Sequence, residues 1–351
     1  MRIAFFEIEQ WEADYIKSQI SNLKSQIEFF FTEKKIDKDN LDEVLRQVQD
    51  RNFDAISIFV GSEIKKEVID AFPNLKLLTT RSAGFDHIDL EAIKQKNIKA
   101  GYVPGYGDNT VAEFAFALIL NLSRKIFEAY DRIKEKGLFD FEGLRGFDLK
   151  GKTIGVVGTG RIGKYAVAIA KGFGMNVLAF DSYPDEKFAA EKGFKYVSLD
   201  ELLENSDVIS LHVPYFPSTS SGQGTHHLIN SNNINKIKKG ALLINTARGA
   251  IVETDALVKA LNEGRLGGYG ADVLEEEGVI KDERQFLLYG NLEGHNLKTV
   301  LENHVLIDMP NVIITPHNAF NTTEALQRIL DTDIENIKSF IEKGETKFPI
   351  P

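Results

Sequence analysis

The sequence predicts an α/β fold of two doubly wound parallel-sheet domains, and three observations support this fold class. Short apolar runs alternate with amphipathic segments of helical composition along most of the chain, a pattern typical of parallel strands joined by crossover helices. A glycine-rich turn joins one apolar run to a helical stretch near the middle of the chain. The length of 351 residues suffices for two domains of about 150 residues each.

The first series of predicted strands lies before residue 100. Its apolar runs occupy residues 2–6, 27–31, 55–60 and 75–80, and helical stretches such as 41–48 and 65–71 separate them. We expect a parallel sheet with helices on both faces. This series contains no glycine fingerprint.

A long helix is expected to follow the first series. Residues 109–134 have helical composition, and their first half is apolar enough for a mostly buried helix. Asp108 or Asn109 is the expected N-cap, because a short polar side chain can accept a hydrogen bond from the first turn.

The second series begins at Thr153 and contains the glycine-rich turn. Its later apolar runs occupy residues 177–181, 207–213, 241–247, 268–273 and 311–317. A long polar excursion at 275–303 interrupts the series, with short helices expected at 286–289 and 297–301. After residue 317, a polar turn leads to an amphipathic helix that ends near Glu342 and returns the chain to the first domain.

The turn after the apolar run at 154–157 has the spacing of a dinucleotide-binding fingerprint. It contains Gly158, Gly160 and Gly163, and a helical stretch follows. In such a turn the first glycine allows the tight connection, the second lets a pyrophosphate approach the backbone, and the third lets the helix pack on the strand. The phosphates would bind at the helix N-terminus, where free N–H groups and the helix dipole attract an anion.

Asp181 indicates which dinucleotide binds. It ends the next apolar run, eighteen residues after Gly163, where a carboxylate can accept hydrogen bonds from both ribose hydroxyls and repels a 2′-phosphate. No arginine follows it closely, and Lys187 is the nearest cation in the sequence. We therefore expect NAD rather than NADP.

Composition and charge argue against several other functions. A net charge of −10 with no dense Lys/Arg block disfavours nucleic acid as a partner. The absence of cysteine excludes a disulfide, a thiolate nucleophile and a cysteine-bound zinc. The N-terminal residues do not have the pattern of a signal peptide, and no apolar run is long enough for a membrane span. We expect a cytoplasmic protein that does not bind a membrane.

The adjacent residues His226 and His227 raise the question of a metal site. Consecutive side chains of an extended segment point to opposite faces. We therefore expect the two imidazoles to diverge and no metal to bind.

Three side chains at or just beyond strand ends form a candidate catalytic set: Arg248, Glu277 and His317. Ligands of an open α/β sheet bind beyond the carboxyl ends of its strands, so these groups can converge on one crevice. Arg248 would hold a substrate carboxylate, His317 would exchange a proton with the substrate oxygen, and Glu277 would orient the imidazole and favour its protonated form. Alone, Arg248 is better explained as a surface ion-pair partner and Glu277 as part of a solvated face, and a single histidine before a helix is often a capping or packing residue. Only the combination favours hydride transfer to a 2-keto acid.

The order of these motifs resembles that of the D-isomer-specific 2-hydroxyacid dehydrogenases, most closely the D-lactate dehydrogenase branch. The shared motifs are GTGRIG at 158–163, Asp181, LHVP at 211–214, NTARG at 245–249, DV followed by glutamates at 272–277, TPH at 315–317, RSAGFDHID at 81–89, VPGYGDNTVAEF at 103–114 and THHLIN at 225–230. The branch is indicated by Tyr106, Asn109, Ala112, Glu113 and Phe320. The resemblance covers essentially the whole chain.

The resemblance implies a role for each matching residue. Arg248, Glu277 and His317 match the family's catalytic arginine, glutamate and histidine. The substrate-binding positions are Ala83, Gly84, Tyr106 and Phe320. The NAD contacts are the three glycines and Asp181 together with Thr110, Arg161, Ile162, Val213, Pro214, Thr246, Ala247 and Asp272, the last near the nicotinamide carboxamide.

The resemblance also implies the domain organisation. Residues 1–100 and 319–351 would form a flavodoxin-like substrate domain, and residues 101–318 an inserted NAD-binding Rossmann-like domain. Members of the family usually dimerise through the NAD-binding domain, so we expect a homodimer.

The leading functional hypothesis is an NAD-dependent D-lactate dehydrogenase that reduces pyruvate. Alternatives within the family are a glyoxylate, hydroxypyruvate or 3-phosphoglycerate dehydrogenase, although a phosphorylated substrate requires extra cations in the pocket and the sequence shows no clear cluster beyond Arg81 and Arg248. An alternative from another class is an NAD-sensing binding protein like the corepressors of the same family. Insertions at 218–225 and 278–310 depart from the family pattern: the first would touch the adenine end of the cofactor or project into solvent, and the second could cover the cleft.

Overall fold

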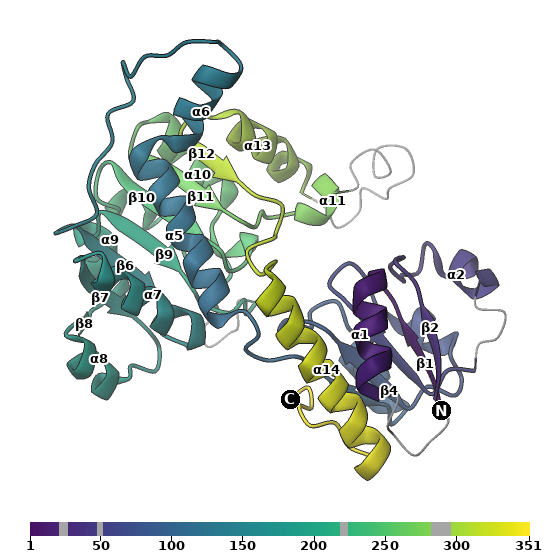
Figure 1. Ribbon diagram of the computed structural model, residues 1–351. Helices are drawn as coiled ribbons and strands as arrows, with labels where there is room; N and C mark the ends of the chain where they lie inside the picture. The colour runs from purple at the N-terminus through teal and green to yellow at the C-terminus, as the bar shows by residue number, and fades with distance from the viewer. Residues whose placement is uncertain (21–26, 48–51, 218–223, 282–295) are drawn as a thin grey trace. The chain divides into compact units, whose positions relative to one another are not determined.

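The chain folds into two compact units (Figure 1). The computed structural model describes residues 1–20, 27–47, 52–217, 224–281 and 296–351. Unit 1 comprises Met1–Tyr106 and Thr322–Pro351, and unit 2 comprises Gly107–Asn321. Unit 2 is therefore one continuous stretch that interrupts unit 1.

Unit 1 contains a five-stranded parallel sheet. Its strands are β1 (Arg2–Phe5), β2 (Glu28–Phe31), β3 (Ala55–Ile58), β4 (Leu77–Thr80) and β5 (Lys99–Gly101), and its helices are α1 (Gln10–Ile20), α2 (Leu41–Gln47), α3 (Lys66–Asp70), α4 (Leu90–Gln95) and α14 (Thr323–Lys343). The strand order β2-β1-β3-β4-β5 is the flavodoxin-like order.

Helix α14 covers one face of this sheet together with α1. It begins where the Thr322 hydroxyl accepts a hydrogen bond from the Ala325 amide at 3.2 Å, and it ends at Gly344, whose φ of 75° is left-handed. Its apolar side chains enter a core that β1 and α1 also form. The opposite face of the sheet is covered by apolar residues of α2, α3 and α4.

Unit 2 contains a seven-stranded parallel sheet. Its strands are β6 (Thr153–Val157), β7 (Asn176–Phe180), β8 (Lys195–Tyr196), β9 (Val208–Leu211), β10 (Ala241–Asn245), β11 (Leu266–Ala271) and β12 (Val312–Ile314). The order is β12-β11-β10-β9-β6-β7-β8, which is the Rossmann order with one added edge strand. The chain reverses its direction of strand addition between β6 and β9, and ligands of such sheets bind at that point.

Helices cover both faces of the unit 2 sheet. They are α5 (Asp108–Arg124), α6 (Ile126–Lys134), α7 (Arg161–Gly172), α8 (Glu186–Lys192), α9 (Leu199–Asn205), α10 (Thr254–Asn262), α11 (Glu277–Lys281) and α13 (Leu297–Asp308). Apolar residues of α5 and α7 pack on one face, and those of α9 and α10 pack on the other. The predicted α/β fold class, with two doubly wound parallel sheets, is confirmed. In the described ranges no helix has the length and apolar character needed to cross a membrane.

The linking helix differs from the prediction. It consists of two helices, α5 and α6, because Lys125 between them is left-handed with a φ of 53°, and the Asn121 side chain accepts a hydrogen bond from the Phe127 amide at 2.8 Å. The predicted N-cap is also wrong. Gly107 takes that position, and Asp108 is the first helical residue.

Other differences concern short elements. Strands β5 and β8 have three and two residues and were not predicted, because so short a run has no measurable apolar alternation. The helix expected at 297–301 continues to Asp308 as α13. The helix expected at 286–289 and residues 218–223 of the first insertion lie outside the described residues.

Candidate active site

The candidate site lies at the carboxyl ends of the unit 2 strands. All strand pairs of this sheet are parallel, so the turns that follow them leave the sheet at the same edge. These turns contain the glycine fingerprint after β6, residues 212–214 after β9, 246–248 after β10, 272–277 after β11 and 315–317 after β12. Five separate stretches of sequence thus contribute to one edge.

The three glycines of the fingerprint are required for different geometric reasons. Gly158 has a φ of 91°, and a Cβ there would lie 2.8 Å from the His212 carbonyl oxygen. A Cβ on Gly163 would lie 1.9 Å from the Gly158 carbonyl oxygen, so α7 can pack this closely only with glycine. A Cβ on Gly160 would have no neighbour within 4 Å. The turn is therefore rigid at both ends and open at Gly160, at the N-terminus of α7, which fits the approach of a pyrophosphate.

Asp181 follows β7 beside this turn. One carboxylate oxygen, Oδ2, accepts hydrogen bonds from the Thr159 amide at 2.6 Å and the Thr159 hydroxyl at 3.0 Å. The other, Oδ1, accepts one from the Tyr183 amide at 2.8 Å. Because a carboxylate can accept about four hydrogen bonds, Asp181 both fixes the glycine turn and keeps capacity for a ribose hydroxyl.

The remaining predicted cofactor positions lie on the same edge or near it. Thr110 and Arg161 belong to the first turns of α5 and α7, and an ion pair of 2.8 Å between Asp108 and Arg161 joins these turns. Thr246 is buried at the end of β10, and its hydroxyl has no hydrogen-bond partner in the described part of the chain. A buried hydroxyl of this kind fits a site that a polar ligand completes. Ile162, Val213, Pro214 and Ala247 flank these positions in the same turns.

Asp272 shapes the segment that carries His317. Its buried carboxylate accepts hydrogen bonds from the Thr315 hydroxyl at 2.5 Å, the Asn318 amide at 3.0 Å and the Ala319 amide at 2.7 Å. Burial raises the pKa of Asp272, and these hydrogen bonds oppose that shift. The segment is thereby folded tightly around His317, whose φ of 53° is left-handed.

His317 and Glu277 form a hydrogen-bonded pair. Nδ1 of His317 donates to Oε1 of Glu277 over 2.8 Å. The two side chains are 29% and 32% exposed, so both remain accessible to a small molecule. Because Glu277 occupies Nδ1, Nε2 is the imidazole nitrogen left for proton exchange.

Arg248 is held at the end of β10 by a buried asparagine. The Asn245 side chain donates to the Arg248 carbonyl oxygen at 2.9 Å and accepts from the Ala247 amide at 3.1 Å. Asn245 has no exposed surface. Asn245 was not among the predicted site residues, although its position in the NTARG motif was a signal.

The predicted substrate positions belong to different units. Phe320 is half-buried in unit 2, three residues after His317. Ala83 is exposed and Gly84 is half-buried in a turn of unit 1 after β4, where the Ser82 hydroxyl donates to the Gly84 carbonyl oxygen at 2.6 Å. In the same unit, the Tyr106 carbonyl oxygen accepts a hydrogen bond from Arg328 Nε at 2.7 Å.

Arg81, at the start of that turn, is a structural residue. It is 1% exposed, and its guanidinium donates to the carbonyl oxygens of Phe6 and Glu7 at 2.7 Å each. Burial lowers the pKa of Arg81. Its charge is directed into unit 1, so it does not supply an extra cation for a phosphorylated substrate.

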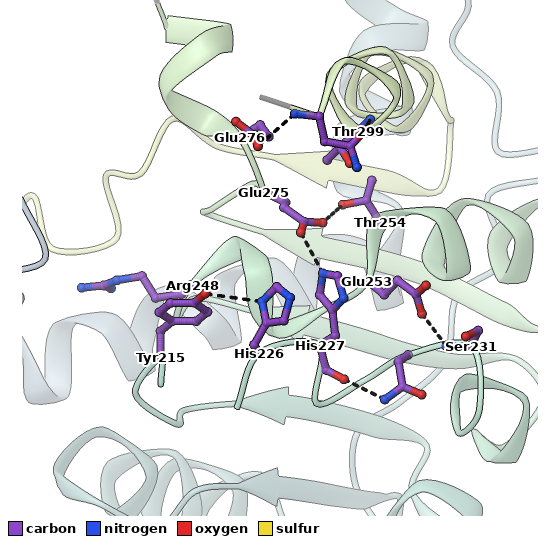
Figure 2. Close-up of polar contacts among 12 residues, drawn as sticks. Tyr215, His226, His227, Ser231, Arg248, Glu253, Thr254, Glu275, Glu276 and Thr299 are labelled. Carbon is purple, nitrogen blue, oxygen red and sulfur yellow. Dashed lines mark hydrogen bonds and ion pairs between the residues drawn. The ribbon is translucent and has the colours of Figure 1, made fainter. Parts of the chain in front are cut away.

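The prediction that His226 and His227 point to opposite faces is wrong. Their rings stack with centroids 3.9 Å apart and an interplanar angle of 22°, because His227 is left-handed with a φ of 49° rather than extended. Nε2 of His227 donates to Glu275 at 2.7 Å (Figure 2). Over the part of the chain that the structure describes, no group of three or more His, Asp or Glu side chains could hold a metal ion.

Comparison with known proteins assigns the chain to a family. The family described as "D-isomer specific 2-hydroxyacid dehydrogenase, NAD binding domain" matches residues 116–319, which lie within unit 2. The D-lactate dehydrogenase of Escherichia coli K12 is 35% identical over 99% of this chain and 98% of its own length. A glyoxylate reductase of Thermofilum pendens is 38% identical over 87% of this chain and 82% of its own length.

A solved structure agrees with this assignment. The crystal structure of D-lactate dehydrogenase from Aquifex aeolicus, complexed with NAD and lactic acid, covers 98% of each chain with a TM-score of 0.79 and 36% identity. Sequence motifs, strand order and similarity over the full length therefore agree. The chain belongs to the D-isomer specific 2-hydroxyacid dehydrogenase family, and it is an oxidoreductase with an NAD-binding domain.

Proposed function

We propose that this enzyme reduces a small 2-keto acid to the D-2-hydroxy acid with NADH, and that pyruvate and D-lactate are its preferred pair. The observation that carries the proposal is the His317–Glu277 hydrogen bond of 2.8 Å at the sheet edge that also holds Arg248 and the glycine fingerprint. The relatives named for D-lactate favour pyruvate as the substrate.

Arg248 binds the substrate carboxylate. A guanidinium presents two parallel N–H groups to a carboxylate, which fixes both position and orientation. The positive charge of the guanidinium also polarises the substrate carbonyl next to that carboxylate. Arg248 already donates one hydrogen bond, from Nη1 to the Ala247 carbonyl oxygen at 2.8 Å, so the guanidinium is partly oriented before a substrate binds.

His317 acts as the general acid during reduction and as the general base during oxidation. When bound, NADH supplies the hydride that adds to the carbonyl carbon. Nε2 of His317 gives its proton to the carbonyl oxygen as that oxygen gains charge. Glu277 accepts from Nδ1 throughout, which holds the ring in place and leaves Nε2 as the nitrogen that exchanges the proton.

The other predicted site residues complete the proposal. The backbone amides of Ala83 and Gly84 bind the substrate carboxylate, and Tyr106 and Phe320 contact the substrate side chain. The three glycines, Asp181 and the neighbouring positions listed from the sequence bind NAD. The cytoplasmic location stays a prediction.

A glyoxylate reductase is the second candidate, because a relative of that name is 38% identical. A phosphorylated substrate is disfavoured by the burial of Arg81.

Steady-state kinetics test the proposal. Purified enzyme is assayed by NADH oxidation with pyruvate, glyoxylate, hydroxypyruvate, 2-ketoisocaproate and phenylpyruvate, and we expect the highest kcat/KM with pyruvate. His317→Ala should lower kcat by roughly 10²- to 10⁴-fold, the usual contribution of a general acid, with an unchanged Kd for NADH. His304→Ala, in α13, is the matched histidine control.

The outcomes separate the candidates. Highest kcat/KM with glyoxylate selects the second candidate. NADH binding without turnover of any keto acid, or full activity of His317→Ala, rejects the proposed mechanism.

We further propose that the enzyme is a homodimer formed through α6 and the segment after it. This part of unit 2 extends beyond its sheet (Figure 1). Its exposed apolar residues are Ile126, Phe127, Tyr130, Ile133, Leu138, Phe139 and Phe141, the last two 92% and 89% exposed. A monomer rarely leaves so many large apolar side chains together in water, and a two-fold axis would let the same patch cover itself.

Light scattering coupled to gel filtration tests the dimer. The chain mass is 39.3 kDa, and we expect the native protein at twice that value. The double substitution of Phe139→Glu and Phe141→Glu should give the single-chain mass, whereas Leu301→Glu, at an exposed apolar position of α13, should not. A single-chain mass for the native protein contradicts the proposal.

A further inference from the structure

Two backbone segments of unit 2 are tied together just after Arg248. The His227 amide donates to the Ala250 carbonyl oxygen at 2.8 Å, the Ile229 amide to Ile251 at 3.1 Å, and the Glu253 amide to Ile229 at 2.9 Å. The segment 227–229 therefore lies alongside 250–253 as a short parallel pair.

A third segment, the one that leads to Glu277, packs against the residue next to Arg248. A Cβ on Gly249 would lie 2.0 Å from the Leu274 carbonyl carbon and 2.2 Å from the Glu275 amide nitrogen. The two backbones are in direct contact, so any shift of the segment 274–277 is also a shift relative to Arg248.

Glu275 links this third segment to the other two. Its Oε1 accepts from Nε2 of His227 at 2.7 Å, and its Oε2 accepts from the Thr254 hydroxyl at 2.7 Å (Figure 2). The side chain is only 17% exposed, so water competes little for these bonds. The Glu275 carbonyl oxygen accepts from the buried Asn303 side chain at 2.7 Å. Hydrogen bonds to a carboxylate are stronger than those between neutral groups.

Glu276, between Glu275 and Glu277, turns the chain. Glu276 is left-handed with a φ of 58°, a conformation that costs a residue other than glycine about 1 kcal/mol. The turn lets Glu275 reach His227 while Glu277, two residues later, reaches His317. A strained turn persists only where its surroundings hold it, and the contacts of Glu275 lie directly before it.

We propose that Glu275 and His227 are positioning residues, which hold Glu277 in register with Arg248. The inference rests on the proposed function, because it assigns no chemistry of its own to either residue. The Arg248 side chain extends away from this cluster in Figure 2, so the pair acts through the backbone that the segments share. Without the pair, Glu277 and the His317 ring that it contacts lose their fixed position relative to Arg248, and a misplacement of about 1 Å can lower a rate by about 100-fold.

Four single variants of the full chain test the positioning role. Glu275→Ala should lower kcat at least tenfold while the Kd for NADH, measured by fluorescence, stays within twofold. Glu275→Gln should recover most of the rate, because its amide can bond both His227 and Thr254. His227→Gln should lower kcat in the same direction and serves if Glu275→Ala does not fold. The matched control is Glu253→Ala, which removes a carboxylate that accepts from the Ser231 amide at 2.6 Å in the same pair of segments.

A double variant decides whether Glu275 acts through Glu277. Glu275→Ala added to Glu277→Gln should leave kcat where Glu277→Gln alone puts it, because residues that act as a unit are not additive. If the two single-variant losses in kcat multiply in the double variant, or if Glu275→Ala keeps the wild-type kcat, the inference is overturned while the proposed function stands. Wild-type kcat in Glu277→Gln overturns the proposed function and the inference with it.

Discussion

Asp181 already has hydrogen-bond partners within the protein. Its carboxylate receives the amide and hydroxyl of Thr159, so the same charge fixes the glycine turn and faces the proposed ribose site. The Thr159 hydroxyl also lies 2.7 Å from the Tyr196 hydroxyl. Removal of Asp181 therefore has two effects, on the cofactor and on the turn.

The preference for NADH over NADPH should depend on Asp181. In Asp181→Ala, the ratio of kcat/KM for NADH to that for NADPH should fall at least tenfold, because the repulsion of a 2′-phosphate is lost. Thr159→Val removes the hydroxyl contact but keeps the carboxylate, so its ratio should remain near that of the native enzyme. An unchanged ratio in Asp181→Ala means that another group selects the cofactor.

At the residue scale, side chains at strand ends were predictable and those that depend on backbone turns were not. Glu277 and His317 each follow a strand, so their approach could be expected from a parallel sheet. The contact between His227 and Glu275 requires left-handed backbone at His227 and Glu276. Neither residue type specifies that conformation, so the two imidazoles of His226 and His227 were expected to diverge, and Glu275 and Glu276 were placed in a polar excursion.

At the scale of elements, the glycine fingerprint separates a folding requirement from a binding requirement. Gly163 is closed in by the backbone of Gly158, whereas Gly160 faces open space. The two positions are three residues apart in the same turn. They therefore allow a matched comparison.

Gly163→Ala should destabilise the protein, and Gly160→Ala should weaken NADH binding without destabilising it. The first substitution places a Cβ 1.9 Å from a backbone oxygen, an overlap that typically costs about 1 to 3 kcal/mol. The second adds a methyl group where a pyrophosphate would approach. Tm and the Kd for NADH are measured for both; equal Tm losses in both variants would contradict the distinction.

The elements themselves were predicted in proportion to their length and apolar content. Buried strands such as β10 are continuous apolar runs and were recognised. The division of the linking helix at Lys125 could not be seen, because the break depends on one left-handed lysine and on the Asn121 cap rather than on a glycine or proline.

At the scale of the whole molecule, a buried histidine links stability to pH. His212, at the end of β9, is almost fully buried and bonds the Ser210 hydroxyl at 2.9 Å. Burial lowers its pKa from 6.5 to about 4. Between these pH values the unfolded chain binds a proton that the folded chain does not.

The native enzyme should therefore lose stability as the pH falls from 6.5 towards 4. His212 contributes up to about 1.4 kcal/mol per pH unit to this loss, or on the order of 3 kcal/mol in total, and its contribution is fully present above pH 6.5. Urea unfolding followed by circular dichroism at pH 7.5 and 5 should show a smaller loss in His212→Asn. Ser210→Ala keeps the imidazole and should lose as much unfolding free energy between these pH values as the native enzyme. Equal losses in the native enzyme and both variants would assign the pH effect to groups other than His212.

Unit 1 is assembled from two stretches of chain, and this determines when it can finish folding. Helix α14 supplies Leu330, Ile334 and Ile337 to the core that Ile3 and Phe5 also form, yet a ribosome makes α14 only after all of unit 2. At 5 to 20 residues per second, translation of residues 107–321 takes roughly 10 to 40 seconds. During that interval, part of one apolar face of the nascent N-terminal sheet remains uncovered, while the continuous unit 2 can fold. The domain begun second is therefore completed first.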